Sequence, residues 1–162
     1  MEKAIAVVVS YNRRALLSEC ITALRNQTQK LDAILVVNNG STDDTEQWLK
    51  EQTDVIFITQ KNLGSSGGFN AGISWAYKNG YSWIWCMDDD GYPKEDALQN
   101  ILAVEINQLC LLNCAVINKE DKTMYSDDLK VDNNKIKSFI DFKTEVEFVN
   151  EAKKIFKLLA SR

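Results

Sequence analysis

The chain has 162 residues, 45% of them hydrophobic, which is enough to bury the core of one domain. Its 19 basic and 23 acidic side chains give a net charge of −4, which argues against a general nucleic-acid-binding surface. The absence of histidine excludes zinc sites that need an imidazole and nucleophiles that a histidine activates, so acid–base chemistry falls to carboxylates.

No apolar stretch approaches the length of a membrane span, and residues 1–3 lead directly into a short strand-like run. We therefore expect a cytoplasmic protein. The four cysteines lie in apolar surroundings and are expected to be reduced core thiols: Cys20, Cys86, Cys110 and Cys114.

Apolar runs alternate with amphipathic stretches along the first hundred residues. Residues 4–9 are typical of a strand covered on both faces, and apolar residues between 16 and 24 then repeat at helical spacing. The pattern continues with strands expected at 34–37, 55–59 and up to residue 87, and helices at 45–51 and 70–78. Such alternation predicts an α/β fold, with a mostly parallel sheet and helices on both faces.

Polar residues follow each predicted strand, at the carboxyl ends where open α/β sheets bind ligands. After the first strand, Tyr11 offers a flat face to a base, between Ser10 and Asn12. After the second, the amides of Asn38 and Asn39 can donate to and accept from a base edge. Each piece alone is equally typical of ordinary structure, namely a packing tyrosine and a turn before a helix cap. Together they predict a nucleotide site.

Three consecutive acids follow the apolar run 83–87. In an extended chain alternate side chains share a face, so we expect Asp88 and Asp90 to hold one divalent cation, with Asp89 pointing the other way. A cation would relieve the repulsion among the acids and neutralise a diphosphate. The alternative is a helix cap, with Pro93 in the first turn of the following helix, although three acids exceed what a cap needs.

Residues 62–72 are rich in glycine, follow a predicted strand and open a predicted helix. Glycines there would let backbone N–H groups approach an anion at the helix N-terminus. The segment has neither the Gly-Lys-Ser/Thr of a Walker loop nor the glycine spacing of the dinucleotide fingerprint. A flexible loop is the alternative.

Four motifs carry a resemblance to a known family. They are Val-Val-Ser-Tyr-Asn-Arg at 8–13, Val-Val-Asn-Asn-Gly-Ser-Thr-Asp at 36–43, Asn-Leu-Gly-x-x-Gly-Gly-Phe-Asn at 62–70 and Trp-Ile-Trp-x-Met-Asp-Asp-Asp-Gly at 83–91. In order and spacing they resemble the family 2 inverting glycosyltransferases, and the last two are most similar to the galactofuranosyltransferase and rhamnosyltransferase branch. The resemblance covers about residues 4–105.

This resemblance implies the GT-A nucleotide-diphospho-sugar transferase fold and a role in cell-wall or polysaccharide biosynthesis. The donor would be a nucleotide-sugar, UDP-linked by expectation, and the acceptor a glycan or lipid-linked molecule, with inversion at the transferred sugar. The implied metal is Mn²⁺ or Mg²⁺ on Asp88 and Asp90. With the strand-end pattern, the resemblance assigns nucleotide and donor binding to Ser10, Tyr11, Asn12, Asn38, Asn39, Gly67, Gly68, Asn70 and Asp89.

The chain departs from the family in two respects. Family members commonly have an acid where Asn38 or Asn39 stands, accepting from the uracil N3–H, and an amide carbonyl accepts without the charge. The family's general base is a carboxylate in the acceptor half, and no motif identifies it here.

We expect residues 1–118 to form the donor-binding region and 119–162 a partial acceptor-side region of the same domain. Residues 148–159 predict a basic amphipathic helix that docks onto the core. The alternative is peripheral contact with the inner face of a membrane that carries a lipid-linked acceptor.

Two other classes of function stay open beside sugar transfer. A binding module that keeps the nucleotide site without turnover would explain the missing base and the short acceptor half. A nucleotidyltransferase also uses acids and magnesium on an α/β sheet, but it should carry a basic loop that grips phosphate, for which only Arg13 and Arg14 are candidates.

Overall fold

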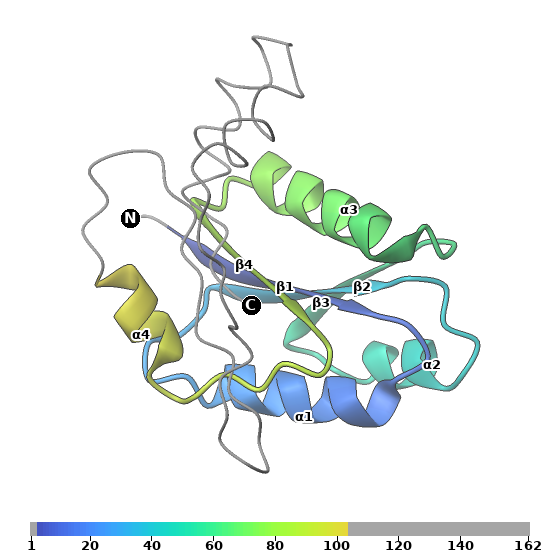
Figure 1. Cartoon of the computed structure of the whole chain (residues 1–162), viewed down its shortest axis with the longest axis horizontal. Helices are drawn as coiled ribbons and strands as arrows, with labels where there is room; N and C mark the ends of the chain where they lie inside the picture. The colour runs from blue at the N-terminus through green and yellow to red at the C-terminus, as the bar shows by residue number, and fades with distance from the viewer. Residues whose placement is uncertain (1–2, 104–162) are drawn as a thin grey trace, which may run out of the picture.

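Four strands with nearly continuous apolar runs form one parallel sheet in the computed structural model, which describes residues 3–103. The strand order is β3-β2-β1-β4 (Figure 1). All seven residues of β1 are buried, because this strand has neighbours on both edges and helices on both faces. The strands are β1 (Ala4–Ser10), β2 (Ala33–Asn38), β3 (Val55–Thr59) and β4 (Trp83–Asp88).

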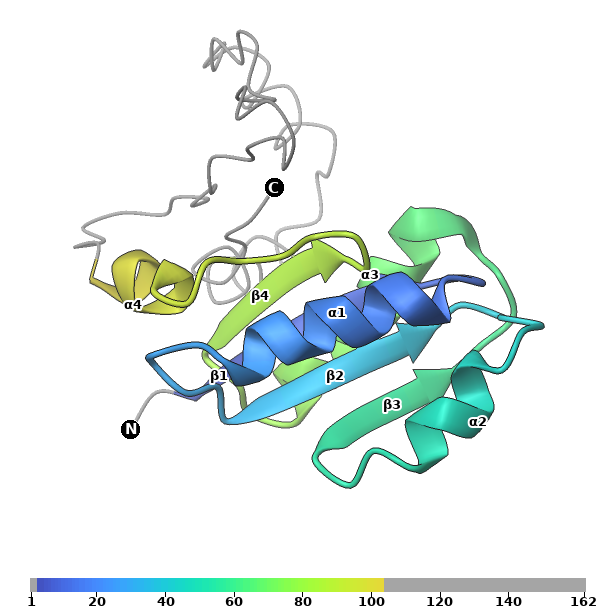
Figure 2. The same ribbon diagram turned by 90° about the horizontal axis from the view of Figure 1, so that it is seen from below.

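Helices cover both faces of this sheet, which confirms the predicted α/β class. The helix α3 lies on one face and α1 on the other, with α2 beside β3 and α4 beside β4 (Figures 1 and 2). The helices are α1 (Arg14–Arg25), α2 (Thr45–Lys50), α3 (Gly64–Lys78) and α4 (Ala97–Leu102). None of the helices in residues 3–103 is long and apolar enough to cross a membrane.

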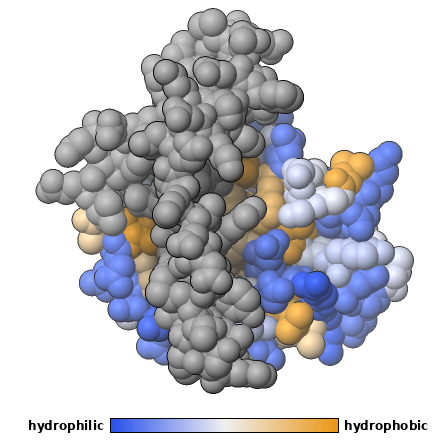
Figure 3. Space-filling model, viewed as in Figure 1, coloured by the Kyte–Doolittle hydropathy of each residue, from blue (hydrophilic) through white to orange (hydrophobic). Residues whose placement is uncertain are grey.

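Two apolar clusters, one on each face, hold the helices to the sheet. Alternate residues of β1 belong to different clusters: Ala6 and Val8 lie in the cluster that includes residues of α1, α2 and α4, whereas Val7 lies in the cluster under α3. On α1 the buried residues recur at helical spacing, as expected: Leu17, Cys20, Ile21 and Leu24. In the view of Figure 3, the visible surface of the described residues is mostly hydrophilic and carries small hydrophobic areas.

The helix α3 begins at Gly64, six residues before the predicted start, so the glycine-rich segment opens the helix as expected and the flexible-loop alternative is wrong. Its glycines are explained by packing. A Cβ added at Gly68 would lie 2.5 Å from Val9 Cγ1, and one at Gly72 would lie 2.4 Å from Val7 Cγ1. Close approach of helix and sheet therefore outweighs the low helix propensity of glycine.

The alternative that the acidic triplet caps a helix is wrong. The helix α4 begins at Ala97, so Pro93 lies in the preceding loop and not in a first helical turn. The expectation of buried thiols is confirmed for Cys20 and Cys86, where burial raises each pKa to about 12. Cys110, Cys114, the proposed region 119–162 and the predicted helix at 148–159 lie outside the described residues.

Candidate functional site

The sheet register brings the polar strand ends to one edge, as the sequence predicts. Ser10 at the end of β1 pairs with Asn38 at the end of β2, and Asn38 pairs with Thr59 of β3. On the other side of β1, Val9 pairs with Asp88 of β4. The parallel strands therefore deliver their following loops to the same end of the sheet, where α/β folds bind ligands.

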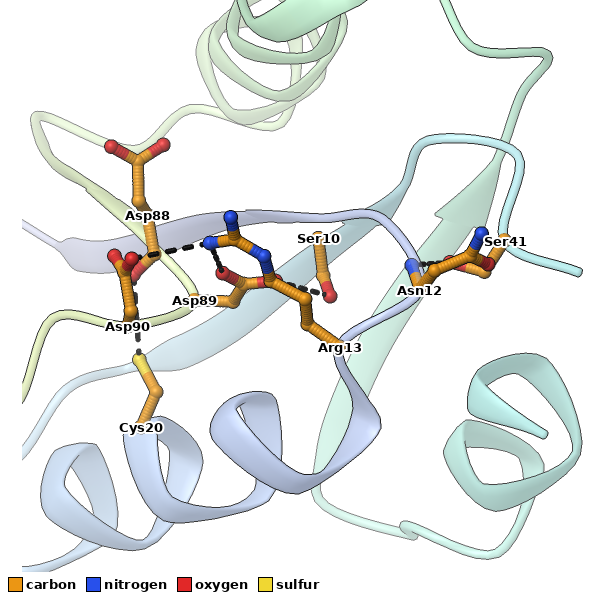
Figure 4. Close-up of polar contacts among 8 residues, drawn as sticks. All are labelled: Ser10, Asn12, Arg13, Cys20, Ser41, Asp88, Asp89 and Asp90. Atoms are coloured by element: carbon orange, nitrogen blue, oxygen red, sulfur yellow. Dashed lines mark hydrogen bonds and ion pairs between the residues drawn. The ribbon is translucent and has the colours of Figure 1, made fainter. Parts of the chain in front are cut away.

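The loop after β1 is fixed to the loop after β2 through Asn12 (Figure 4). Asn12 has a φ of +55°, which asparagine tolerates better than most residues. Its backbone N–H donates to Ser41 Oγ at 3.0 Å, and its Oδ1 accepts from the Thr42 backbone N–H at 2.7 Å. This reciprocal pair leaves Tyr11 at the edge with 45% of its surface exposed, so its ring is available to a planar ligand.

Asn38 and Asn39, predicted to contact a base edge, are both buried, Asn38 at the end of β2 and Asn39 in the loop that follows. Asn38 Oδ1 accepts from the Ser41 backbone N–H at 3.1 Å. Asn39 Oδ1 accepts from Gln60 Nε2 at 2.8 Å, and Asn39 Nδ2 donates to the Gly64 carbonyl at 3.0 Å. These amides hold the β2 and β3 loops together, and they are not placed to read a base.

The donor-site residues predicted in the glycine segment lie within α3. The first four N–H groups of a helix lack intrahelical partners, and in α3 they belong to residues 63–66, before Gly67 and Gly68. Two of them are already satisfied, since Leu63 N donates to Asn39 and Gly64 N donates to Asn62 Oδ1. Of the three predicted positions, Asn70 is the one with an exposed side chain.

The three acids do not follow the alternation of an extended strand. β4 ends at Asp88, and Asp89 and Asp90 form a turn that the Gly91 N–H closes onto the Asp88 carbonyl at 3.2 Å. Figure 4 shows the Asp88 carboxylate pointing away from Asp90, so the expected common face of these two is wrong for this structure. Asp90 turns instead toward Arg13.

Asp89 is the buried member of the triplet, with 3% of its surface exposed. It accepts from Ser10 Oγ at 2.7 Å and from Arg13 Nη1 at 3.3 Å (Figure 4). Burial raises the pKa of Asp89, while the bonds from Ser10 and Arg13 oppose that shift. Asp89 therefore ties β4 to the loop after β1, and its carboxylate is committed within the protein.

Arg13 contacts two of the three acids at this edge, which sequence reasoning does not predict. Its Nη1 also lies 3.1 Å from Asp90 Oδ2, and the two acids raise the pKa of Arg13, Asp89 contributing most. The sequence offers one indication: Arg13 stands directly before α1, where a capping side chain or an acid is favoured. A basic residue there needs another reason.

Hard divalent cations suit the outward-facing acids by chemistry. Asp88 and Asp90 are exposed and supply carboxylate oxygens, the ligands that Mg²⁺ and Mn²⁺ prefer, with waters and phosphates completing the shell. Within residues 3–103 no group of three or more acidic, cysteine or histidine side chains is gathered for a metal. The donor set fits such an ion by its chemistry, provided that the Asp90 side chain leaves Arg13 and that the Asp88 and Asp90 carboxylates, which point apart here, turn toward one ion.

The chain is similar to known proteins both in sequence and in structure. The model of the family described as glycosyl transferase family 2 matches residues 5–151. Galactofuranosyltransferase GlfT1 of Mycolicibacterium smegmatis is 32% identical over 124 residues, which are 74% of this chain and 41% of that protein. GlfT1 of Mycobacterium tuberculosis H37Rv is 31% identical over 128 residues, 75% of this chain and 42% of that protein. The chain thus spans about two fifths of these curated relatives.

Solved structures share the fold. TarS 1–349 of S. aureus matches with a TM-score of 0.62 at 20% identity, over 72% of this chain and 36% of that chain. Its complex with UDP-GlcNAc matches with a TM-score of 0.58 at 21% identity, over 75% of this chain and 36% of that chain. A 4-diphosphocytidyl-2C-methyl-D-erythritol synthase matches at 0.57 and 12% identity, over 100% of this chain and 90% of that chain. These likenesses confirm the predicted GT-A fold.

Proposed function

Because this chain belongs to the family 2 glycosyltransferases, we propose that it forms the donor side of a metal-assisted sugar transferase. It takes a sugar from a nucleotide diphosphate, UDP by preference, and passes it with inversion to a glycan or lipid-linked acceptor. The convergence of the β1, β2 and β4 ends, with the acidic triplet, at one edge of the sheet is the observation that carries the proposal. The names of the relatives and the UDP-GlcNAc complex of TarS support the donor class.

The residues of the edge take different parts in this proposal. The exposed Tyr11 ring stacks on the base, and the backbone of Ser10 and Asn12 lines the nucleoside. Asp88 and Asp90 would hold Mn²⁺ or Mg²⁺ once their carboxylates turn toward one ion, and the ion would neutralise the departing diphosphate. Asp89 fixes the turn that presents its two neighbours.

Inversion follows from a single displacement. The acceptor oxygen forms a bond to the anomeric carbon from one side as the bond to the diphosphate oxygen breaks on the other. A carboxylate general base takes the acceptor proton. No residue between 3 and 103 is assigned this role, so we place it in the acceptor half of the whole protein. A lipid-linked acceptor would bring that protein to the cytoplasmic face of a membrane.

The nucleotidyltransferase alternative is disfavoured by the partners of the two arginines. Arg13 is engaged by Asp89 and Asp90, and Arg14 Nε lies 3.0 Å from Asp44 Oδ2. Neither forms a basic loop open to phosphates. The likeness to the diphosphocytidyl-methylerythritol synthase, at 12% identity, concerns the fold alone. The other alternative is a binding module without turnover. Slow hydrolysis of a UDP-sugar in the presence of metal would count against it.

Calorimetric titration with UDP, in the presence and absence of Mn²⁺, tests the proposal, with GDP and dTDP as base controls. We expect UDP binding that requires metal and is lost in Asp90→Asn. Asp96→Asn is the matched control, since it removes the same charge at the start of α4. Binding of no nucleotide by the folded wild-type chain, or equal binding by Asp90→Asn, would contradict the proposal.

A further inference from the structure

One guanidinium nitrogen serves two of the three acids. Arg13 Nη1 lies 3.3 Å from Asp89 Oδ1 and 3.1 Å from Asp90 Oδ2 (Figure 4). The two contacts differ in environment, because the Asp89 side chain is 4% exposed and the Asp90 side chain is 55% exposed. Arg13 itself is about half exposed, so the guanidinium lies across the boundary between core and solvent.

The buried contact is the durable one. Asp89 also accepts from Ser10 Oγ at 2.7 Å. If Arg13 left, the buried carboxylate of Asp89 would lose its ionic partner, which is costly. The contact with Asp90 faces water, where ion pairs are weak and exchange readily with dissolved ions. A dissolved cation can therefore replace Arg13 at Asp90 while Arg13 remains on Asp89.

The local sequence supports a role for Arg13 beyond helix formation. It occupies the N-cap position of α1, and its side chain makes no capping bond. Positive charge is unfavourable at the N-terminus of a helix dipole, and serine, threonine, aspartate or asparagine would stabilise this position better. The side chain instead crosses to the end of β4, and its ion pairs with the acids offset that cost.

We propose that Arg13 is a built-in counter-cation of the acidic triplet: it stays on Asp89 and releases Asp90 when a divalent metal binds. This inference rests on the proposed function. A metal arriving alone must displace a guanidinium and meets added positive charge, so it binds weakly. A diphosphate that arrives with the metal offsets this charge, so metal and nucleotide bind more tightly together than either does alone.

Titration with Mn²⁺ in the absence of nucleotide tests this role, with free Mn²⁺ followed by electron paramagnetic resonance. We expect Arg13→Gln to bind Mn²⁺ about five- to tenfold more tightly than the wild type, because one competing positive charge is gone. Arg14→Gln is the matched control. It removes the same charge at the next position, where the partner is Asp44, and should stay within about twofold of the wild type.

A second measurement keeps the test valid if Arg13→Gln does not fold. In the wild type, added Mg²⁺ should shift the guanidinium N–H resonances of Arg13 and leave those of Arg14 in place. Equal or weaker Mn²⁺ binding by folded Arg13→Gln, or an unmoved Arg13 resonance at saturating Mg²⁺, would overturn the inference.

The UDP titration separates the inference from the proposed function. Metal-dependent UDP binding by the wild type, without tighter Mn²⁺ binding by Arg13→Gln, refutes the counter-cation and leaves the function standing. Tighter Mn²⁺ binding by Arg13→Gln without UDP binding by any variant supports the counter-cation and refutes the function.

Discussion

Polar side chains at the carboxyl edge divide into those that hold loops in place and those that are exposed to solvent. Asn39 belongs to the first group, since its oxygen and nitrogen are both bonded to the segment that leads into α3. Tyr11 and Asp90 belong to the second, as both are exposed. The division matters because we expect a change in the first group to alter stability and a change in the second to alter the proposed binding.

Replacing Asn39 by alanine should therefore destabilise the fold. The change leaves Gln60 Nε2 and the Gly64 carbonyl without their present partner, at a cost of about 2 kcal/mol. Urea unfolding of the wild type and of Asn39→Ala measures the difference. Asn100→Ala, on the exposed surface of α4, is the control and should change the free energy of unfolding by less than about 0.5 kcal/mol. A similar small effect for Asn39→Ala would refute the loop-holding role.

At the residue scale, the sequence predicts which polar residues meet at the edge, but not which of them remain accessible. Spacing along the chain reveals that Asp89 follows a strand. It does not reveal that Ser10, 79 residues earlier, donates to it. The turn at Asp89 and Asp90 is also not predicted. The expected alternation of side chains holds only within a strand, and β4 ends at Asp88. Long-range hydrogen bonds and strand ends decide these orientations.

The helix α3 shows the same limit at the scale of elements. Glycine lowers helix propensity, so local reasoning starts this helix at residue 70, whereas it begins at Gly64. The reason lies in the sheet: Gly72 faces Val7 and Val37, and a Cβ there would lie 3.0 Å from Val37 Cγ2. The four strands lie within one residue of their predicted bounds, because continuous apolar runs are typical of strands in a parallel sheet that helices cover.

Gly72→Ala should destabilise the chain although alanine favours helices. Overpacking costs about 1–3 kcal/mol, and the gain in helix propensity recovers no more than about 1 kcal/mol. Adding Val7→Ala removes the nearest clashing methyl, so the double variant should lose less than the sum of the two single losses. Thermal unfolding of the four proteins completes the cycle. Strict additivity would mean that this contact does not set the helix position.

Arg25, the last residue of α1, forms an ion pair with Asp54, and the contribution of this pair to stability should depend on pH. The Arg25 guanidinium, hydrogen-bonded to Asp54, lowers the pKa of that carboxyl below its ordinary 3.8. An acid with a lowered pKa stabilises the fold above the unfolded value, and the contribution disappears as pH falls through the folded value.

Asp54→Asn should therefore lower the free energy of unfolding at neutral pH by less than about 1 kcal/mol, since the pair is exposed. The difference from the wild type should shrink as pH falls below 3.8 and vanish once pH is below the lowered pKa of folded Asp54. Urea unfolding across this range measures it, with Glu51→Gln as a charge-matched control in the same loop. A difference that persists unchanged at acid pH would contradict the ion pair.

At the scale of the whole molecule, the sheet gathers segments from four distant parts of the chain at one edge. The α/β class and the parallel order follow from alternating strands and helices, so both were predictable. The chain spans about two fifths of its curated relatives, and we propose that the general base belongs to the acceptor half. We therefore propose that the described residues bind the donor, and we assign full transfer to the whole protein.

Manganese relaxation of backbone amide resonances tests the donor site most directly. Mn²⁺ added with UDP to the isotopically labelled chain should broaden first the amides of Ser10 to Arg13 and of Asp88 to Gly91. Amides at the opposite end of the sheet, such as those of Ala4 and Ala33, should broaden last. Replacing Mn²⁺ by diamagnetic Mg²⁺ controls for changes that UDP binding alone causes. Broadening centred elsewhere, or none when UDP is present, would contradict a metal–nucleotide site at the carboxyl edge.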